Sequence, residues 1–327
     1  MDAKSPPVVF APVSLTLWRV THLSLGYLLD TIGLSRGGGD IVDSLLMGAI
    51  MEANVAPFSQ DAALQMAYAN LDTNPPDDMR RPVSINAVAQ SLGLPFETVR
   101  RRISAMCRKG VCVITPRGVI LPSALLDSPP FIAMGIGRYL RLRRFYFDLK
   151  AVDAVPVTEA APLAPVAGAA APSGPPVRVA NRLLSEYMMR FIDSTQRQIN
   201  DPLTVLVLLD MARANIEHLT LGEWEAAIPL ADAQRRPIST AALARRLKVP
   251  LETMRRRTAW LEAEGFCRRL PAGFVVLSSG FARAGLQSVM AENAANVQRL
   301  FHRLARLGIL NVWNAEEEAE KQARSRF

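Results

Sequence analysis

Cysteine and histidine are scarce in this chain, and their scarcity excludes two kinds of site. The sequence holds only three cysteines among its 327 residues: Cys107, Cys112 and Cys267. An odd number at irregular spacing excludes the disulfide framework of a small secreted domain and indicates a reducing compartment. The three histidines are equally scattered: His22, His218 and His302. No second cysteine pair or histidine cluster accompanies them, so we expect no zinc site and no other bound metal.

Patterns that carry catalysis or hold a cofactor are missing too. The glycine-rich stretch RGGGD, which begins at Arg36, is too short for a phosphate-binding loop and follows no clear strand, so it predicts a hinge. The sequence contains no catalytic constellation. We therefore expect a protein that is not an enzyme and that needs no cofactor.

Long uncharged apolar runs are absent as well. The stretch from Val13 to Leu34 is apolar, but it carries Arg19, His22 and Asp30, which a membrane span of about 20 residues tolerates poorly. A buried or dimer-forming helix is the better interpretation. The first residues contain no basic segment followed directly by an apolar core, so we expect no signal peptide, no membrane association and a cytoplasmic, nucleoid-associated protein.

Basic charge, by contrast, is in excess. The chain has 38 lysines and arginines against 30 aspartates and glutamates, a formal net charge of +8. That balance indicates an acidic partner, either nucleic acid or an anionic membrane. The length predicts two domains of about 100–200 residues, each with its own core.

A long internal repeat is the most informative feature of the sequence. Shifted by 155 residues, segment 80–123 aligns with segment 235–278 without a gap, and 18 of the 44 pairs are identical. Both copies contain Pro-x-Glu-Thr-x-Arg-Arg-Arg, beginning at Pro95 and at Pro250. Upstream, MAYAN at Met66 and MARAN at Met211 match at a shift of 145, which predicts ten extra residues in the second copy. A repeat of this length indicates a duplicated domain.

The segment between the copies, residues 151–177, is rich in alanine and proline and nearly uncharged. It predicts a linker with an end-to-end distance of roughly 30 Å, which would let the two copies sit apart. The remaining plan is an N-terminal helical segment (1–39), a first domain with a trailing helix (40–150), a second domain with a trailing helix (178–310) and a charged tail (311–327) that is frayed or disordered.

Each copy predicts a helix, a tight turn, a second helix and a hairpin. Ser84 precedes apolar residues at helical spacing, and Gly93 ends that first helix. Pro95 begins the second helix, in which apolar residues recur at i, i+4 and i+7 from Val99. Beyond Gly110, β-branched residues on either side of a Pro-Arg-Gly turn predict two short strands.

This arrangement resembles the winged helix-turn-helix domains of bacterial transcription regulators. The stretch LGLPFETVRR, from Leu92 to Arg101, is similar to the second helix of Crp/Fnr-type DNA-binding domains. It departs from that pattern at Pro95, where the family has a small N-cap residue, and at Phe96 and Leu251, where it has arginine. The implied fold is mainly α with small β wings, as two winged helix-turn-helix domains in tandem, each with flanking helices.

The resemblance also implies which side chains read DNA. Glu97 and Arg101 in the first copy, and Glu252 and Arg256 in the second, would point into the major groove. Arginine can donate two hydrogen bonds to guanine, and glutamate can accept one from cytosine. The alternative is an exposed ion pair between residues four apart on one helix, worth about 0.2–0.5 kcal/mol.

Neighbouring polar residues are expected to contact phosphates and to set the register on the duplex. In the first copy they are Thr98, Arg100, Arg102, the pair Arg80 and Arg81, and Arg117 at the hairpin tip. In the second copy they are Thr253, Arg255, Arg257, Arg235, Arg236 and Arg268. The stems of Arg102 and its counterpart should also cover the edge of the core.

Basic charge is concentrated in the repeat. Segment 80–118 has eight basic residues and one acidic residue, and segment 235–273 has ten basic and three acidic residues. Each module is therefore strongly positive, while the rest of the chain is net negative, as an interface for a polyanion requires.

We therefore expect a sequence-specific, double-stranded DNA-binding transcription regulator whose two recognition helices enter adjacent major grooves about 34 Å apart. Because the copies differ, the target should be an imperfect palindrome or a direct repeat. Two alternatives stay open: a replication-initiation or chromosome-organising DNA-binding protein, and a protein–protein adaptor that binds no DNA. Further expectations are a homodimer through the N-terminal or trailing helices and, as an alternative DNA contact, the basic face of residues 138–144.

Overall fold

Two series of elements follow one another along the chain. The computed structural model describes residues 14–36, 39–154, 174–199, 201–227, 230–281 and 283–324. The first series is α1 (Leu15–Arg36), α2 (Ile41–Gln60), α3 (Ala62–Ala67), α4 (Ile85–Ser91), α5 (Phe96–Arg108), β1 (Val113–Thr115), β2 (Gly118–Ile120), α6 (Ser123–Leu126) and α7 (Pro129–Ala151). The second is α8 (Val177–Gln196), α9 (Pro202–Ile216), α10 (Leu221–Ala226), α11 (Thr240–Leu247), α12 (Leu251–Ala263), β3 (Cys267–Leu270), β4 (Gly273–Val276), α13 (Ser278–Phe281) and α14 (Ala284–Arg306), followed by α15 (Ile309–Arg324).

The second series repeats the first element by element, so the duplication is longer than the repeat visible in the sequence. α8 takes the place of α1, α9 that of α2 and α14 that of α7. The predicted fold class, mainly α with two small β-hairpins in two helical units, is confirmed.

One part of the predicted alignment is wrong. MARAN, which ends at Asn215, lies in α9, whereas MAYAN, which begins at Met66, lies at the end of α3. The true counterpart of Asn215 is Asn54 in α2, because the two asparagines make the same hydrogen bonds. The second copy is therefore the shorter one between this helix and the arginine pair.

Local sequence signals form the helix-turn-helix units. Ser84 caps α4 by accepting a hydrogen bond of 3.1 Å from the backbone N–H of Ala87. The turn into α5 uses Gly93 at a φ of +60°, and the matching turn uses Lys248 at +48°, although a lysine adopts that conformation at a cost. Helices α5 and α12 then bury one stripe each: Val99, Ile103 and Met106, and Met254, Thr258 and Leu261.

A two-stranded antiparallel hairpin follows each helix-turn-helix unit. β1 pairs with β2, and β3 pairs with β4. In each copy, the residue just before the helix-turn-helix unit pairs with the hairpin through one antiparallel β-bridge. The pairs are Val83 with Val119 and Ile238 with Phe274. Gly118 stands at that crossing with a φ of +136°, and a Cβ there would lie 2.6 Å from the carbonyl oxygen of Val83. Only glycine fits this position.

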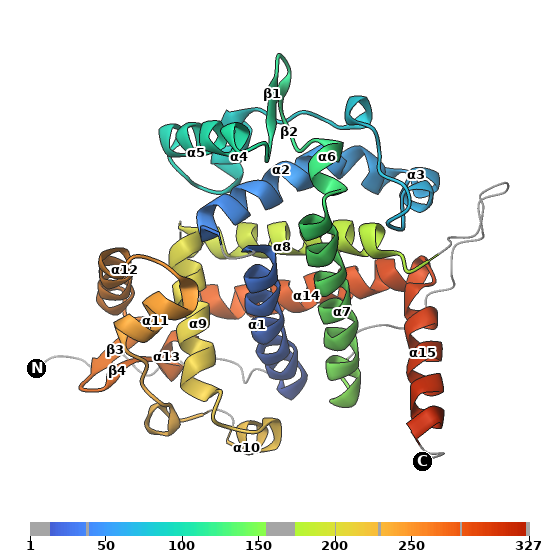
Figure 1. The fold of residues 1–327 in the computed structure, drawn as a ribbon. Coiled ribbons are helices and arrows are strands. Elements are labelled where there is room, and N and C mark those ends of the chain that lie inside the picture. Colours follow the sequence, from blue (N-terminus) through green and yellow to red (C-terminus); the bar gives the residue numbers. More distant parts are fainter. Residues whose placement is uncertain are drawn as a thin grey trace, which may run out of the picture.

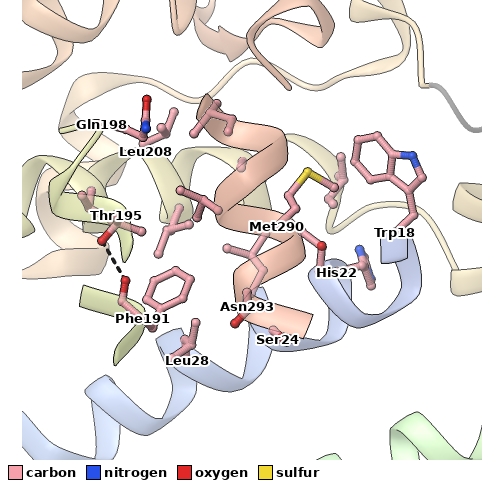
Figure 2. A pocket seen from close by; sticks show the side chains of 18 of the residues that line it. Trp18, His22, Ser24, Leu28, Phe191, Thr195, Gln198, Leu208, Met290 and Asn293 are labelled. Atoms are coloured by element: carbon pink, nitrogen blue, oxygen red, sulfur yellow. Dashed lines mark hydrogen bonds between the residues drawn. The ribbon is translucent and has the colours of Figure 1, made fainter. Parts of the chain in front are cut away.

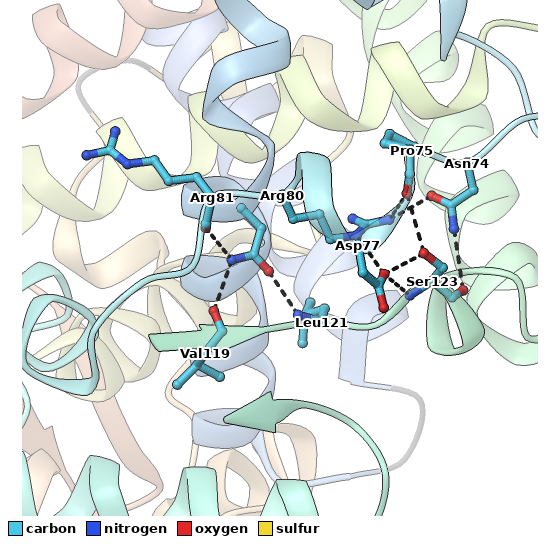
Figure 3. A network of polar contacts seen from close by, with 9 residues as sticks. Asn74, Pro75, Asp77, Arg80, Arg81, Val119, Leu121 and Ser123 are labelled. Atoms are coloured by element: carbon cyan, nitrogen blue, oxygen red, sulfur yellow. Dashed lines mark hydrogen bonds and ion pairs between the residues drawn. The ribbon is translucent and has the colours of Figure 1, made fainter. Parts of the chain in front are cut away.

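One buried asparagine in each copy holds the hairpin against a core helix. Asn54 of α2 donates hydrogen bonds to the carbonyl oxygens of Arg81 (2.8 Å) and Val119 (3.1 Å) and accepts one from the N–H of Leu121 (2.9 Å). Figure 3 labels these three partners. Asn215 of α9 makes the same three bonds, to the matching residues Arg236, Phe274 and Val276. The two copies thus fix their hairpins by the same polar contact.

The two copies share one core because their first helices cross over. α1 packs against α7 of its own copy and against α9 and α14 of the other copy. In the same way, α8 packs against α14 of its own copy and against α2 and α7 of the first copy. Figure 1 shows α1, α7, α8 and α14 in the middle of the molecule. Contacts exchanged reciprocally in this way define a two-fold relation between the halves.

Two expectations about domain organisation are corrected by this crossover. A single cluster of buried apolar residues runs through both copies, so the prediction of one separate core per domain is wrong. The copies are held together by α1 and α8 and do not sit apart. Most of the predicted linker, residues 155–173, lies outside the described residues.

The charged tail and the trailing helix also differ from expectation. Residues 311–324 form most of α15, which is anchored by the buried Trp313 through a 2.7 Å hydrogen bond from its Nε1 to the hydroxyl of Tyr139. On α7, Arg141 pairs with Asp30 at 2.8 Å, and Arg143 pairs with two acidic residues of α15, Glu316 and Glu320. Much of the supposed basic face of 138–144 is therefore neutralised by carboxylates, which makes it a poor contact for DNA.

Two helices, α1 and α2, are apolar enough to raise the question of whether the chain crosses a membrane. α1, predicted as a buried helix, is buried: Tyr27 and Leu28 lie in the core. Within the described part of the chain, Ile41–Ser59 of α2 is the one segment long and apolar enough to cross a membrane. It packs against α8 and α5, and core helices of soluble proteins share this length and composition.

Candidate nucleic-acid interface

Helices α5 and α12 each present a polar face on the side away from the apolar stripe. On α5, Glu97 and Arg100 expose 70% and 51% of their side chains, and Arg101 beside them is exposed. The matching residues of α12 are exposed as well: Glu252, Arg255 and Arg256. The structure therefore brings the predicted groove-facing residues onto one solvent-accessible face of each second helix.

The glutamate on each face pairs with a different arginine from the one expected. Glu97 accepts hydrogen bonds of 2.6 and 2.9 Å from Arg100, three residues further on and not four. This bonding to Arg100 holds the pKa of the Glu97 carboxyl below its ordinary value. Glu252 pairs with Arg255 in the same way, at 3.3 Å.

The middle arginine of each triplet takes no part in this pairing. Arg101 and Arg256 have no ion pair with any described residue, and both are exposed. Thr98 and Thr253, on the same helices, are half-buried. Each helix thus offers one exposed guanidinium whose donors are not held by a carboxylate of the same chain.

The third arginine of each triplet is structural. Arg102 forms ion pairs with Asp40 (3.0 Å) and Asp43 (2.7 Å) at the start of α2. Arg257 pairs with Asp201, the N-cap residue of α9, at 2.6 Å. The prediction that the aliphatic stems of these arginines cover the core edge agrees with this position. The prediction that their guanidinium groups contact phosphate does not. The guanidinium groups are held by the N-terminal carboxylates of the core helices.

The first arginine of each upstream pair is interior, which corrects the prediction that it contacts phosphate. Arg80 is 2% exposed and donates to Asn74 Oδ1 (2.9 Å), the carbonyl oxygen of Pro75 (2.8 Å) and Asp77 Oδ1 (3.3 Å). Burial lowers the pKa of its guanidinium, and Asp77 opposes that shift. The side chain of Arg235 is similarly enclosed, at 7% exposure.

The second arginine of each pair stays outside. Figure 3 shows Arg81 reaching away from the network into which Arg80 turns. Arg236 is exposed in the second copy. The hairpins add Arg117, at the tip of the first, and Arg268, on β3 of the second; both are exposed. These four cations flank the two helix faces and are available for an anion.

Two apolar residues on the same faces were not predicted as contacts. Phe96 and Leu251, the first residues of α5 and α12, are 48% and 39% exposed. Their position outside the apolar stripe, directly after a proline, is the signal in the sequence that could have identified them. An exposed apolar side chain at the start of such a helix can contact a thymine methyl group.

The described residues contain no group of three or more histidine, cysteine, aspartate or glutamate side chains that could hold a metal ion. Cys107 and Cys112 lie with their sulfur atoms 3.1 Å apart, between the end of α5 and the first hairpin. Burial raises the pKa of the Cys112 thiol, as it does that of Cys267 in the second copy. The thiols of Cys112 and Cys267 are therefore protonated and buried at neutral pH.

Comparison of the chain with protein-family models, with curated proteins and with solved structures found no match. What can be stated of its class is the architecture itself. The chain holds two helix-turn-helix units, each followed by a β-hairpin and built into one intertwined helical core.

Proposed function

We propose that this protein is a sequence-specific, double-stranded DNA-binding transcription regulator, and that each of its two units is a winged helix-turn-helix domain. The observation that carries the proposal is the pair Arg101 and Arg256. Each is the exposed arginine of its triplet that has no ion pair among the described residues, at the same place on the second helix of its unit. An arginine on the exposed face of a recognition helix can donate two hydrogen bonds to guanine in the major groove.

The residues around Arg101 and Arg256 would have different roles in binding. Phe96 and Leu251 would contact bases through thymine methyl groups, whereas Glu97 and Glu252 are held by neighbouring arginines and would orient them. The remaining exposed cations would bind phosphates and set the register: Arg81, Arg117, Arg236 and Arg268. Arg80, Arg102, Arg235 and Arg257 take no direct part, because their side chains are enclosed or paired within the fold.

The two-fold relation of the halves favours one kind of target. Units related by a two-fold axis meet the two strands of a duplex in opposite orientation, as the half-sites of an inverted repeat require. Because the units differ at Phe96 and Leu251, the half-sites should not be identical. We therefore favour an imperfect inverted repeat over a direct repeat.

Selection from a pool of random duplexes, followed by gel-shift titration, tests the proposal. The double variant Arg101→Ala, Arg256→Ala should lose about 1–3 kcal/mol of base discrimination at each half-site while retaining binding to unrelated DNA. The matched control is Arg144→Ala, an exposed arginine of α7 that pairs with Asp148. Undiminished specific binding by the double variant would refute the recognition-helix assignment.

A salt titration separates phosphate contacts from base contacts. Arg81→Ala with Arg236→Ala should weaken binding to all sequences alike and reduce the slope of log affinity against log salt by about 2, since each phosphate contact contributes about 0.9. If no selected or unrelated duplex binds with a salt-dependent affinity, the protein is the protein–protein adaptor considered at the outset, and the DNA-binding proposal fails.

A further inference from the structure

Two cavities occupy matching places in the two halves. One has a volume of about 130 Å³ and is lined by helices α1, α8, α9 and α14; Figure 2 shows Trp18, His22, Phe191 and Met290 around it. The other, of about 70 Å³, is lined by α2, α7 and α8. Apolar cavities of about 150 Å³ are large enough to bind benzene. The larger cavity approaches that size, whereas the smaller one suits a ligand smaller than benzene.

The duplication makes the two linings comparable position by position. Arg80 of the smaller cavity corresponds to Arg235 of the larger one, and Arg138 corresponds to Asn293, both at the shift of 155 residues that aligns the repeat. The polar character of the linings nevertheless differs. Arg138, Arg178 and Arg182 line the smaller cavity in addition to Arg80, whereas Arg235 is the one arginine among the described residues that line the larger cavity.

Three arginines of the smaller cavity are held by other groups of the protein. Arg182 donates to the carbonyl oxygens of Tyr68 (2.9 Å) and Gln65 (2.8 Å). Arg178 pairs with Asp127 at 2.8 Å. Arg80 is held by the network of Figure 3 described above. Each of these guanidinium groups thus has a carboxylate or carbonyl acceptor, although one nitrogen of each has no partner among the described residues.

Arg138 is the exception. Its contacts are weak ones, to the hydroxyl of Ser185 at 3.3 Å and to the sulfur of Met188 at 4.0 Å, and no carbonyl or carboxylate oxygen of a described residue accepts from it. Burial lowers the pKa of its guanidinium, opposed by the nearby hydroxyl of Tyr27. Among the described residues, no carboxylate lines either cavity that borders it. A half-buried cation without a counter-ion is unfavourable, so this arrangement calls for an anion.

The surroundings of Arg138 indicate the class of that anion. A second cavity of about 60 Å³ adjoins the first, and Arg138 and Ser185 line both. The walls the two cavities share are otherwise apolar: Met51, Phe131 and Met134. A phosphate, with two charges and strong hydration, suits such walls poorly, whereas a carboxylate fits the planar fork of one guanidinium.

We propose that the smaller cavity binds a small monocarboxylate with an apolar body, anchored by Arg138. The carboxylate accepts from the guanidinium and from the hydroxyl of Ser185, and the apolar body lies among Met51, Phe131 and Met134. The matching cavity of the second half does not bind carboxylates in this way, because Asn293 stands in place of Arg138. This site is independent of the proposed DNA-binding function.

Methionine methyl NMR on the full-length protein tests the proposal with propionate, a monocarboxylate smaller than benzene, as the probe. Propionate should shift the methyl resonances of Met51 and Met134 saturably and leave Met290, in the other cavity, unchanged. 1-Propanol, which has the same carbon chain and no charge, should bind at least tenfold more weakly, because it lacks a charge-assisted hydrogen bond to the guanidinium.

Variants assign the effect to one side chain. Arg138→Met should raise the dissociation constant for propionate by about tenfold to a hundredfold. Arg138→Gln is the second neutral variant should the first not fold, and Arg144→Met, on the exposed side of the same helix, is the control that should change nothing. Equal affinities in wild type and either neutral variant, equal binding of 1-propanol, shifts confined to Met290, or no saturable shift would each overturn the proposal.

Discussion

Replacing Asn54 by leucine should destabilise the whole protein, although it removes no charge and leaves no large cavity. The amide of Asn54 is fully buried and makes three hydrogen bonds, two to backbone carbonyls and one from the N–H of Leu121. Leucine has the same branching as asparagine but bulkier methyl groups, so the variant removes the hydrogen bonds and adds some crowding in the core.

The magnitude follows from which backbone groups lose their partners. The carbonyl oxygen of Val119 keeps a second hydrogen bond, from the N–H of Val83 at 3.1 Å. The N–H of Leu121 loses the partner that Asn54 Oδ1 supplies inside the core, at a cost of about 1–3 kcal/mol. The carbonyl oxygen of Arg81 loses its hydrogen bond from Asn54 as well, so the total is about 2–4 kcal/mol.

Urea denaturation followed by circular dichroism measures this loss as a shift of the midpoint of about 1 M. Asn215→Leu should give the same shift, because Asn215 makes the same three bonds in the second half. Asn86→Leu, on the exposed side of α4, is the control and should change the midpoint little. A loss below about 1 kcal/mol in both buried variants would show that the contact does not hold the hairpins.

Backbone conformation and ion pairing lead to three more expected outcomes. Lys248→Gly should raise the free energy of unfolding by about 0.5–1 kcal/mol, because residue 248 has a φ of +48°; a lower melting temperature would contradict this. Gly118→Ala should cost more than about 2 kcal/mol in urea unfolding, since its Cβ would overlap the carbonyl of Val83. Arg102→Met should cost about 0.5–2 kcal/mol through the lost ion pair with Asp40, yet leave specific DNA binding in a gel shift unchanged.

Local chemistry is the part of the fold that could be read from the sequence. A serine cap, a turn residue and an apolar stripe are short-range signals, and in both copies they predicted the helix-turn-helix unit and the hairpin. Lys248 marks the limit of such signals. Nothing in its chemistry favours a positive φ, and the turn forms there because the flanking helices pack as they do around Gly93.

Long-range features could not be read in the same way. The correspondence of α1 with α8 leaves no clear sequence identity, and the crossing of these helices depends on contacts between distant residues. The arginine pair at Arg80 and Arg81 was predicted to act as a unit on phosphate. The backbone at Arg80 is extended, so neighbouring side chains point to opposite sides, one into the core and one into solvent.

Because the two halves belong to one chain, their two-fold arrangement does not require them to have identical sequences. A homodimer with this crossover would carry two copies of every site, whereas here the units can diverge while the two-fold relation persists. The residues that hold the fold have stayed alike, as the paired asparagines and glycines show. Some of the residues proposed to face a partner have diverged: Phe96 stands against Leu251 at the start of the second helices, and Arg138 against Asn293 in the cavities. Divergence at these positions is what the proposed asymmetric DNA target and the proposed single ligand per chain would require.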